Sequence, residues 1–477
     1  MTTQLTWQAE EVIRAVRGQC LHEQSWKAHG VSIDSRSIHV GDLFIALKGP
    51  VHDGHEYVAA AFAAGAAAAI VSRQPSQAAT QSPLIFVDDT FVALEDLGRV
   101  GRQRSSAKII AVTGSVGKTS TKDMLRQILS AVGATYANEG SLNNHWGVPL
   151  SLARLPSDVE YGVFELGMNH AGELGPLSRQ VHPDVTLITN VEAAHLEFFK
   201  SIEAIADAKA EIFLGMSPDG TAILNRDNSH FARLVAAART QGLKRILSFG
   251  SDAKSDARLL TYSNGENGSE IKAEILGRVL DYRLGAPGIH LALNSLAALL
   301  ATVTASGDLD ASAAALACYR QPEGRGGFQA ISLTEGSITI SDESYNASPV
   351  SIRAAIRVLQ EATPKANGRR FLVLGDMREL GETSAQLHAE LARDIIAAKI
   401  DRVYCCGEMM AKLYEALPTE LQGFYTRDSA EMAPHVAIDI QNGDIITVKG
   451  SNAMRMNIIV DAIKALQKHI PQHKLAS

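Results

Sequence analysis

The chain has 477 residues, of which 46% are hydrophobic and 20% charged, a composition typical of a globular protein with more than one domain. Lys plus Arg number 45 and Asp plus Glu number 52, so the formal net charge is −7. This charge excludes the dense basic surface that sequence-independent nucleic-acid binding requires, and an anionic substrate must therefore be held by local groups.

The cysteines and the apolar segments indicate the compartment. Few cysteines suit a reducing cytoplasm, and those present show neither a metal-ligand spacing nor a disulfide framework: Cys20, Cys318, Cys405 and Cys406. The N-terminal sequence MTTQLTWQAE does not resemble a signal peptide. The longest apolar run, 58–71, is shorter than the roughly 20 residues that span a bilayer. We expect a cytoplasmic protein without membrane insertion.

The first part of the chain alternates short strands and helices. Asp42 to Gly49 predicts a strand, 55–72 a helix followed by a strand, and 82–89 another strand. The amphipathic segment 91–106 predicts a helix that ends in a basic connector. We therefore place a first domain at 1–87 and a connecting helix at 88–106.

A second α/β unit is expected at 107–317. Its apolar segments predict strands that alternate with helices, the pattern of a mostly parallel sheet, at AKIIAVTG, YGVFELG, VTLITNV and TAILNRD. Residues 251–284 are polar and alternating, which predicts antiparallel strands at the sheet edge.

A third unit follows the glycine-rich segment CYRQPEGRGGFQ and is expected at 318–477. Its strands are predicted at SITISDE, RRFLVLGDM, RVYCCG and DIITVKGS. The predicted fold class is α/β with three domains, in which a central sheet with a phosphate-binding loop lies between a small N-terminal α/β domain and a Rossmann-like C-terminal domain.

The stretch IIAVTGSVGKTSTKDM (109–124) contains the parts of a phosphate-binding loop. An apolar strand leads to two glycines, a lysine and a hydroxyl residue, and a helix begins behind them. Such a loop presents backbone N–H groups and a lysine to phosphates, and Thr119 stands where a hydroxyl binds Mg²⁺. Val112, however, occupies the position that usually holds the first glycine.

The string Thr113 to Ser120 resembles the loop of the Mur ligase family, ATP-dependent enzymes that form amide bonds in peptidoglycan synthesis. The family does not require glycine at the position of Val112. The resemblance implies that ATP is bound by Gly114, Ser115, Val116, Gly117, Lys118, Thr119 and Ser120.

Three later segments resemble the family's metal-binding motifs. FELGMNHAGEL and TNVEAAHLEFF place Glu165 and His195 after neighbouring strands, where a carboxylate and an imidazole can bind Mg²⁺ beside the loop. IADAKAEIF contains Lys209, which is carbamylated in the family and then serves as an anionic metal ligand. The alternative from the residues alone is a solvated lysine paired with Asp207 or Glu211.

Further motifs complete the resemblance. GIHLALNSLAAL supplies Asn294 for adenine, and PEGRGG supplies Arg325 for the γ-phosphate. SDESYNASP matches a nucleotide- and substrate-binding motif, in which the resemblance implies roles for Asp342, Tyr345, Asn346 and Ser348. It departs from the family at Glu343, where a second Asp is frequent.

The N-terminal segment resembles the family's site for a uridine-diphosphate sugar. The residues implied there are Ser35, Arg36, Lys48, Asp53 and His55. The segment NEGSLNNHWGVPLSL adds two further substrate-binding candidates, Asn143 and Asn144. An Asp-Ser-Arg triplet is by itself an ordinary polar turn, so the order of the three units carries more weight.

The resemblance implies catalysis by Lys118, Glu165, His195, Lys209 and Arg325. It also implies a monomer that uses ATP and Mg²⁺ to join D-alanyl-D-alanine to UDP-N-acetylmuramoyl-tripeptide through an acyl phosphate. Two alternatives remain: another amide ligase of the same type, either the enzyme that adds the third residue or one like folylpolyglutamate synthase, and a nucleotide-binding regulator without catalysis.

Overall fold

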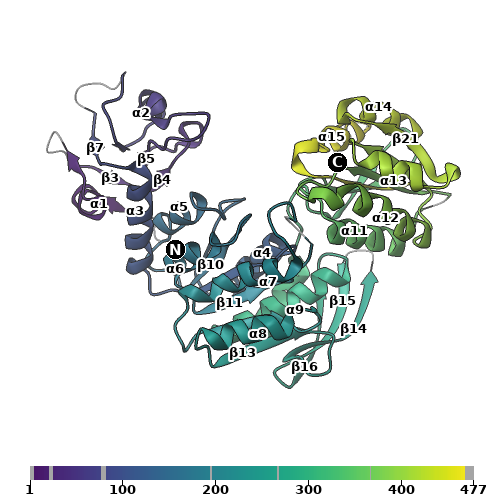
Figure 1. The fold of residues 1–477 in the computed structure, drawn as a ribbon, viewed down its shortest axis with the longest axis horizontal. Helices are drawn as coiled ribbons and strands as arrows, with labels where there is room; N and C mark the ends of the chain where they lie inside the picture. The colour runs from purple at the N-terminus through teal and green to yellow at the C-terminus, as the bar shows by residue number, and fades with distance from the viewer. Residues whose placement is uncertain are drawn as a thin grey trace, which may run out of the picture.

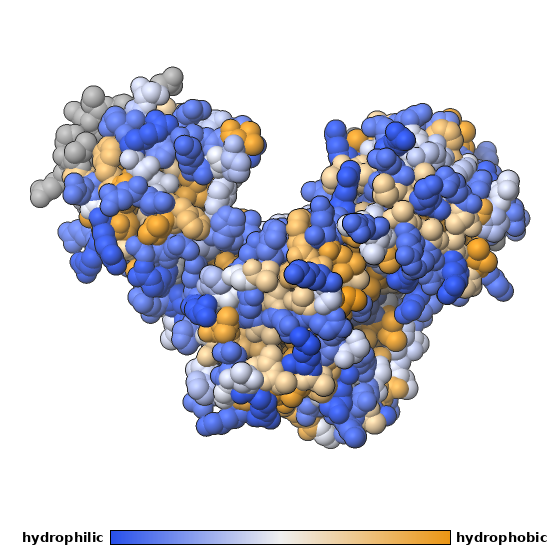
Figure 2. All heavy atoms as spheres, viewed as in Figure 1, coloured by the Kyte–Doolittle hydropathy of each residue, from blue (hydrophilic) through white to orange (hydrophobic). Residues whose placement is uncertain are grey.

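The computed structural model describes residues 5–20, 25–76, 82–193, 196–265, 268–365 and 367–467. Apart from one two-stranded sheet near the N-terminus, three larger sheets follow one another along the chain and form an N-terminal, a central and a C-terminal domain. The N-terminal and C-terminal domains rise from opposite ends of the central one, and open space separates them (Figures 1 and 2).

The N-terminal domain has a five-stranded sheet. Its order is β2 (Gln19–Cys20), β7 (Leu84–Phe86), β6 (Ala68–Val71), β5 (Asp42–Ile45) and β4 (Gly30–Ser32). The β2–β7 pair is antiparallel and the other pairs are parallel. Smaller elements surround the sheet: β1 (Trp7–Gln8), β3 (Lys27–Ala28), α1 (Ala9–Val16), α2 (Val58–Ala63) and the 3-10 turns η1 (Ser35–Ser37) and η2 (Gly54–Tyr57). The prediction of a helix followed by a strand in 55–72 is confirmed.

The predicted connecting helix is α3 (Thr90–Arg104), and it packs closely on α5 (Gly147–Ala153). A Cβ at Gly98 would lie only 2.8 Å from the carbonyl oxygen of Pro149, so glycine permits this approach. Leu150 and Ala153 consequently belong to the same buried cluster as Leu94 and Leu97. Because buried apolar surface stabilises their contact, the N-terminal and central domains share one hydrophobic core.

The central sheet has nine strands. Their order is β16 (Arg278–Leu284), β15 (Gly268–Ile275), β14 (Ala257–Gly265), β13 (Arg245–Gly250), β12 (Thr221–Asn225), β11 (Val185–Ile188), β8 (Lys108–Thr113), β10 (Tyr161–Glu165) and β9 (Thr135–Ala137). The strands from β14 to β9 pair in parallel. The β14–β15 and β15–β16 pairs are antiparallel. The antiparallel edge predicted at 251–284 is therefore confirmed for the two outer strands, β15 and β16.

Helices cover both faces of this sheet, as expected for parallel strands with apolar residues on each side. One face packs on α4 (Lys118–Ser130), α9 (Ile289–Thr304) and α10 (Leu309–Ala315). The other packs on α5, α6 (Leu174–Val181), α7 (Ile202–Ala210) and α8 (Phe231–Thr240). The 3-10 turns η3 (Glu211–Gly215) and η4 (Leu316–Cys318) follow α7 and α10.

The C-terminal sheet has the order β17 (Phe328–Ser332), β18 (Ser337–Glu343), β22 (Ile445–Lys449), β19 (Arg370–Gly375), β20 (Arg402–Cys406) and β21 (Gln422–Thr426). β17 is antiparallel to β18, and the other pairs are parallel. One face packs on α11 (Pro349–Glu361), α12 (Ser384–Ala397) and α13 (Met410–Ala416), and the other on α14 (Ser429–Asp439) and α15 (Asn457–Lys464). Short 3-10 turns complete the domain: η5 (Gly381–Thr383), η6 (Thr419–Leu421) and η7 (Asn452–Met454).

The C-terminal domain meets the central one through polar contacts. Ser141 contacts the hydroxyl of Tyr345, and Asn264 contacts Glu361. The backbone N–H of Glu197 donates to the carbonyl oxygen of Glu379 at 3.1 Å. The buried apolar clusters of the C-terminal sheet contain residues of that domain alone. This junction is therefore of a different kind from the shared core that joins the N-terminal and central domains.

Candidate active site in the cleft between the central and C-terminal domains

The phosphate-binding loop connects β8 to α4, as the sequence predicts. Val112 lies inside β8, where it pairs with Glu165 and Leu187 and is fully buried. The Val112 side chain fills part of the sheet core, where a glycine would leave space. The turn begins only at Gly114, where an added Cβ would overlap the hydroxyl of Thr189.

The chain after β11 fixes the loop. The N–H of Ser115 donates to the Asn190 carbonyl at 3.0 Å, and the N–H of Val116 donates to the Asn190 side-chain oxygen at 3.1 Å. Thr189 donates its hydroxyl to the Val116 carbonyl at 2.6 Å. The Ser115 hydroxyl bonds to the backbone of Glu192. Each hydrogen bond contributes about 1 kcal/mol, so several together hold one loop conformation.

Lys118 starts α4 and points back over the loop. Its ammonium donates to the Gly114 carbonyl at 2.8 Å. Burial lowers the pKa of Lys118, Glu165 opposes that shift, and the positive charge of Arg325 adds to it. The Arg325 guanidinium stacks 4.0 Å from the centre of the Tyr345 ring. The cleft thus holds two cations close enough to influence each other, an arrangement suited to a polyphosphate.

The Glu165 carboxylate lies directly beside the loop. It is 2% exposed, accepts the Thr119 hydroxyl at 2.8 Å on one oxygen, and accepts the Asn143 amide at 2.8 Å on the other. Mg²⁺ prefers oxygen ligands and usually binds through one or two carboxylates plus substrate phosphates. The hydroxyl and the carboxylate fit such an ion, while His195 lies outside the described residues. Within the described part of the chain, no three His, Cys, Asp or Glu side chains gather into a metal cluster.

Lys209 is buried in α7, with 2% of its surface exposed. The acids that could have paired with it are engaged elsewhere: Asp207 bonds Arg233 at 2.6 Å, and Glu211 accepts the N–H groups of Gly172 and Gly175. The alternative of a solvated, paired lysine is therefore wrong. Burial, with the charge of Lys118 adding to it, places the pKa of Lys209 well below the ordinary lysine value.

The segment after β18 brings the C-terminal motif to the cleft. Glu343, the departure from the family pattern, pairs with Lys449 at 3.0 Å. Lys449 also donates to the Asn346 carbonyl at 3.0 Å, and Ser348 caps α11. Asp342 instead accepts bonds from Ser344 and lines a smaller hollow of about 400 Å³.

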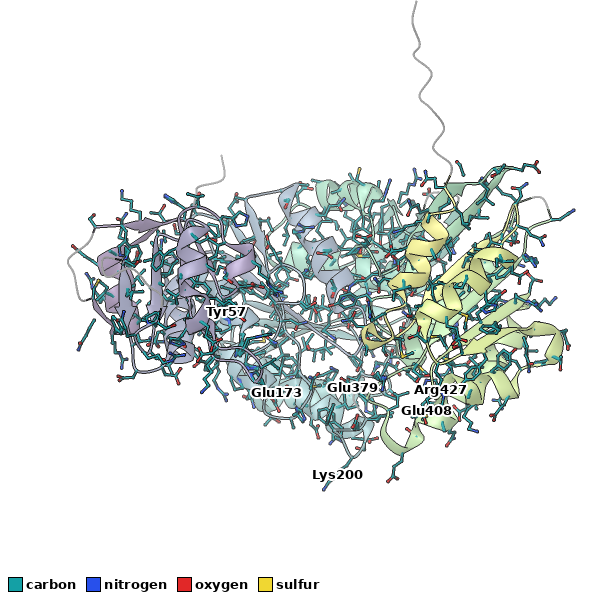
Figure 3. The ribbon with its side chains drawn as sticks, turned by 90° about the horizontal axis from the view of Figure 1, so that it is seen from above. Tyr57, Glu173, Lys200, Glu379, Glu408 and Arg427 are labelled. Atoms are coloured by element: carbon teal, nitrogen blue, oxygen red, sulfur yellow. The ribbon has the colours of Figure 1, made fainter. Side chains whose placement is uncertain are left out.

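A cleft of about 1020 Å³ joins these groups. Its walls include most of the predicted central and C-terminal site residues: Ser115, Val116, Gly117, Lys118, Thr119, Ser120, Asn143, Asn144, Glu165, Asn294, Arg325, Tyr345, Asn346 and Ser348. Glu173 and Glu379 also line the cleft, and Figure 3 shows them near each other along one side of the molecule. Gly114 and Lys209 are not among the residues that line this cleft.

The predicted N-terminal residues are not part of the lining of this cleft. Arg36 is exposed and forms a forked ion pair with Asp34, with the shortest contact at 2.7 Å. Lys48 and Asp53 form an isolated β-bridge, and Ser35 begins η1. His55 is buried: its Nδ1 bonds Asp53 at 2.6 Å, and its Nε2 accepts the N–H of Ser72 at 2.9 Å. The geometry of His55 is that of a residue that fixes the loop before η2.

The cleft also contains residues that the sequence did not single out as site residues. His290, Arg378 and Lys449 line it. Arg378 follows β19 and Lys449 ends β22, two neighbouring strands whose carboxyl ends meet at this edge. The signal was present in LGDMRELG and VKGSN, where glycine and polar residues follow an apolar strand. Their contribution depends on the strand order, which the sequence does not contain.

Three family models match successive parts of the chain. They are the Mur ligase family catalytic domain (residues 27–99), the Mur ligase middle domain (residues 112–302) and the Mur ligase glutamate ligase domain (residues 328–452). The chain belongs to the Mur ligase family. The expected three-domain α/β fold is confirmed.

Within the family, the chain is 36% identical over 431 residues to the UDP-N-acetylmuramoyl-tripeptide–D-alanyl-D-alanine ligase of Rickettsia prowazekii (strain Madrid E); the match covers 90% of this chain and 94% of that protein. MurF from Acinetobacter baumannii superposes with a TM-score of 0.84 at 30% identity, over 97% and 99% of the two chains. MurF ligase from Thermotoga maritima, solved in complex with ADP, gives a TM-score of 0.76 at 26% identity over 92% and 97%.

The described helices also bear on the question of membrane insertion. Within the described ranges, every helix is too short or too polar to cross a bilayer.

Proposed function

We propose that this protein is an ATP-dependent ligase that joins D-alanyl-D-alanine to UDP-N-acetylmuramoyl-tripeptide. One observation carries the proposal: a single cleft between two domains is lined by Lys118, by Arg325 and by the hydrogen-bonded pair of Thr119 and Glu165. A phosphate-binding loop, a carboxylate that fits Mg²⁺ and a second cation are the groups that phosphoryl transfer needs. The named relatives, which match nearly the whole chain, supply the substrates.

The chemistry begins with attack of the tripeptide's terminal carboxylate on the γ-phosphorus of ATP. An oxygen–phosphorus bond forms, the bond to ADP breaks, and an acyl phosphate results. Lys118 and Arg325 hold the phosphate oxygens and neutralise the charge that develops on them. Thr119 and Glu165 would hold Mg²⁺, which when bound would neutralise further negative charge on the phosphates. The use of ATP is supported by the ADP complex of the Thermotoga maritima relative.

The second step forms the amide bond. The amine of D-alanyl-D-alanine attacks the acyl carbon, inorganic phosphate leaves, and the amine gives up a proton. Water would hydrolyse the acyl phosphate, so the cleft must close over it. The polar junction at Ser141 and Tyr345 is the place where such closure can act, because no shared apolar core has to be broken there.

Lys209 is assigned a carbamate in this proposal. A neutral amine attacks carbon dioxide, forms a carbon–nitrogen bond and releases a proton, which leaves an anionic carbamate. The depressed pKa of Lys209 supplies the neutral amine, and its closeness to Lys118 would favour the resulting negative charge. The carbamate then replaces a buried amine by an anion that can bind a metal ion.

The domains divide the work in the same proposal. Residues 1–87 bind the uridine-diphosphate end through Ser35, Arg36, Lys48 and Asp53, with His55 holding the Asp53 carboxylate in place. Residues 88–106 connect them to the central domain. Residues 107–317 bind ATP with Asn294 at the adenine. Residues 318–477 bring Tyr345, Asn346 and Ser348 to the amine substrate, and Asp342 is assigned to the nucleotide. The proposal includes a monomeric enzyme in the cytoplasm.

The test is phosphate release from ATP across a set of muramyl peptides and amines. Release that requires both UDP-N-acetylmuramoyl-tripeptide and D-alanyl-D-alanine supports the proposal, and Lys118→Ala should abolish it without loss of fold. Release supported by a single amino acid or by glutamate on a folate points to another ligase of the type. ATP turnover that ignores every muramyl peptide fits a nucleotide-binding regulator and would sink the proposal.

A further inference from the structure

A buried amide lies underneath the cleft, at Asn138. This residue directly follows β9 and is 1% exposed. Its side-chain oxygen accepts the backbone N–H of Glu165 at 2.8 Å. Its side-chain nitrogen donates to the Leu142 carbonyl at 2.8 Å and to the Glu165 carbonyl at 3.3 Å. The side-chain oxygen and the side-chain NH₂ group of Asn138 are therefore both hydrogen-bonded to the backbone.

The amide takes the place of a peptide group. β9 pairs with β10 in parallel as far as Ala137, and the N–H of Asn138 continues the ladder to the Val163 carbonyl at 3.1 Å. Beyond that point the Asn138 side chain binds both the N–H and the C=O of Glu165, as the next residue of a strand would. The end of β10 is therefore held on the β9 side although β9 itself has ended. A carboxylate could accept from Glu165 but could not donate to the two carbonyl oxygens.

The same amide also fixes the partner of the Glu165 carboxylate. Leu142, whose carbonyl accepts from Asn138, directly precedes Asn143. Asn143 donates its amide to the Glu165 carboxylate at 2.8 Å. The Asn138 side chain therefore holds the backbone of Glu165 and also the backbone next to Asn143, which orients the Glu165 carboxylate.

The helix behind the phosphate-binding loop is tied to this point as well. Lys122 of α4 is 3% exposed, and its ammonium donates to the Asn138 carbonyl at 3.1 Å. The ammonium also pairs with Asp123 at 3.3 Å. Because Thr119 lies one turn earlier on the same helix, Asn138 connects both sides of the hydrogen bond between Thr119 and Glu165.

We propose that Asn138 is a positioning residue, which acts through Glu165 and Thr119 to set the geometry of the divalent-cation site. The proposal rests on the proposed function, in which these two side chains hold Mg²⁺. It extends that function to a residue that touches neither ATP nor the ion. Partners of metal ligands typically change metal affinity or activity by about 10- to 100-fold when they are replaced.

The experiment measures Mn²⁺ binding to the full chain in the presence of ADP, by electron paramagnetic resonance, together with the thermal midpoint of each variant. Asn138→Asp and Asn138→Ser should raise the Mn²⁺ dissociation constant by about 10- to 100-fold. Lys122→Met, which removes a buried ammonium and should fold readily, should raise it by a smaller factor. Tyr282→Phe is the matched control, because it removes a buried hydrogen bond to Ser295 in the same domain without any link to Glu165.

The outcomes distinguish a failure of the role of Asn138 from a failure of the metal-binding role of Glu165. If the folded Asn138 and Lys122 variants bind Mn²⁺ like the wild type, and differ only in thermal midpoint as Tyr282→Phe does, Asn138 is merely structural and the inference is wrong. Glu165→Gln is measured alongside. If Glu165→Gln itself leaves Mn²⁺ binding unchanged, the metal role of Glu165 in the proposed function fails, whatever the Asn138 variants show.

Discussion

Gly117 and Asn294 approach each other closely where both line the cleft. A Cβ added at Gly117 would stand 2.7 Å from the side-chain nitrogen of Asn294. Gly117 also has a φ of +84°, in the left-handed region that side chains rarely adopt. The glycine therefore serves two purposes: it lets the loop turn into α4, and it lets α9 bring its amide against the loop. The phosphate end and the expected adenine end of the nucleotide site are set by one close approach.

The first prediction distinguishes the effect of the positive φ at Gly117 from the effect of its contact with Asn294. Gly117→Ala should weaken nucleotide binding by more than tenfold, because the methyl group displaces Asn294. Gly242→Ala is the matched control, since Gly242 has a φ of +83° and no atom within 4 Å of an added Cβ. Because both positions have nearly the same positive φ, alanine carries a similar backbone cost of roughly 1–2 kcal/mol in each variant. ADP affinity measured by calorimetry decides, and equal affinities in the two variants would show that the Asn294 contact is irrelevant.

The sequence predicted the parts of the site that depend on local structure. The loop, its glycines and the strand that ends in Glu165 follow from hydrophobic pattern and motif, and the structure has them where they were expected. The burial of Lys209 is different. It depends on where α7 packs and on Arg233 taking Asp207, both consequences of contacts that the local sequence does not contain.

The contacts that join the domains also could not be predicted from the sequence. The sequence of NEGSLNNHWGVPLSL indicates only a binding segment, yet Leu150 within it and Ala153 just after it belong to the N-terminal core. Strand β21 was not predicted, because QGFYT is short and half-buried and lacks a clear alternation. The amide at Asn138 gave no signal at all, since a single asparagine after a strand is ordinary in a sequence.

The second prediction concerns Lys209. Lys209→Ala should lose most of its ligase activity, roughly 10- to 100-fold, if a carbamate there helps to hold the ion. Short-chain carboxylic acids added to the assay should restore part of the activity, because they place an anion in the space vacated by the side chain. Lys209→Arg should resist rescue, because its guanidinium stays charged and fills the space. Wild-type rates in both variants would remove Lys209 from the mechanism.

The third prediction is a pH dependence of stability that comes from His388. Its Nδ1 donates to the Ser384 carbonyl at 2.6 Å and its Nε2 accepts the Met377 N–H at 3.0 Å, so the folded state holds the neutral ring. Burial lowers the pKa of His388 below the ordinary 6.5, with the Ser384 carbonyl and Asp376 opposing the shift. Below pH 6.5 His388 takes up a proton in the unfolded chain but stays neutral in the folded chain. The free energy of unfolding therefore decreases as the pH falls.

Thermal midpoints between pH 5 and pH 8 check this prediction. The midpoint of the wild type should drop on acidification from 6.5 downward, and His388→Gln should show a smaller drop. Some pH dependence should remain in the variant, because burial also lowers the pKa of His290. A variant whose midpoint falls as steeply as that of the wild type would show that His388 contributes nothing to the effect.

The fourth prediction concerns the stacking of Arg325 on Tyr345. A cation over an aromatic ring is worth about 0.5–2 kcal/mol, so Tyr345→Ala should lower kcat by roughly 2- to 30-fold through loss of Arg325 placement. Tyr345→Phe keeps the ring and loses only the contact with Ser141, and it should match Ser141→Ala. Steady-state kinetics in ATP give the comparison. Equal losses in the Ala and Phe variants would assign the effect to the hydroxyl instead.

The transfer of oxygen from the tripeptide to phosphate tests the central claim most directly. The terminal carboxylate of UDP-N-acetylmuramoyl-tripeptide is labelled with oxygen-18 and incubated with the enzyme, ATP, Mg²⁺ and D-alanyl-D-alanine. Ligation through an acyl phosphate predicts that each released phosphate carries one labelled oxygen and each product amide retains the other. Phosphate free of label, with both labelled oxygens still in an unligated peptide, would contradict the account.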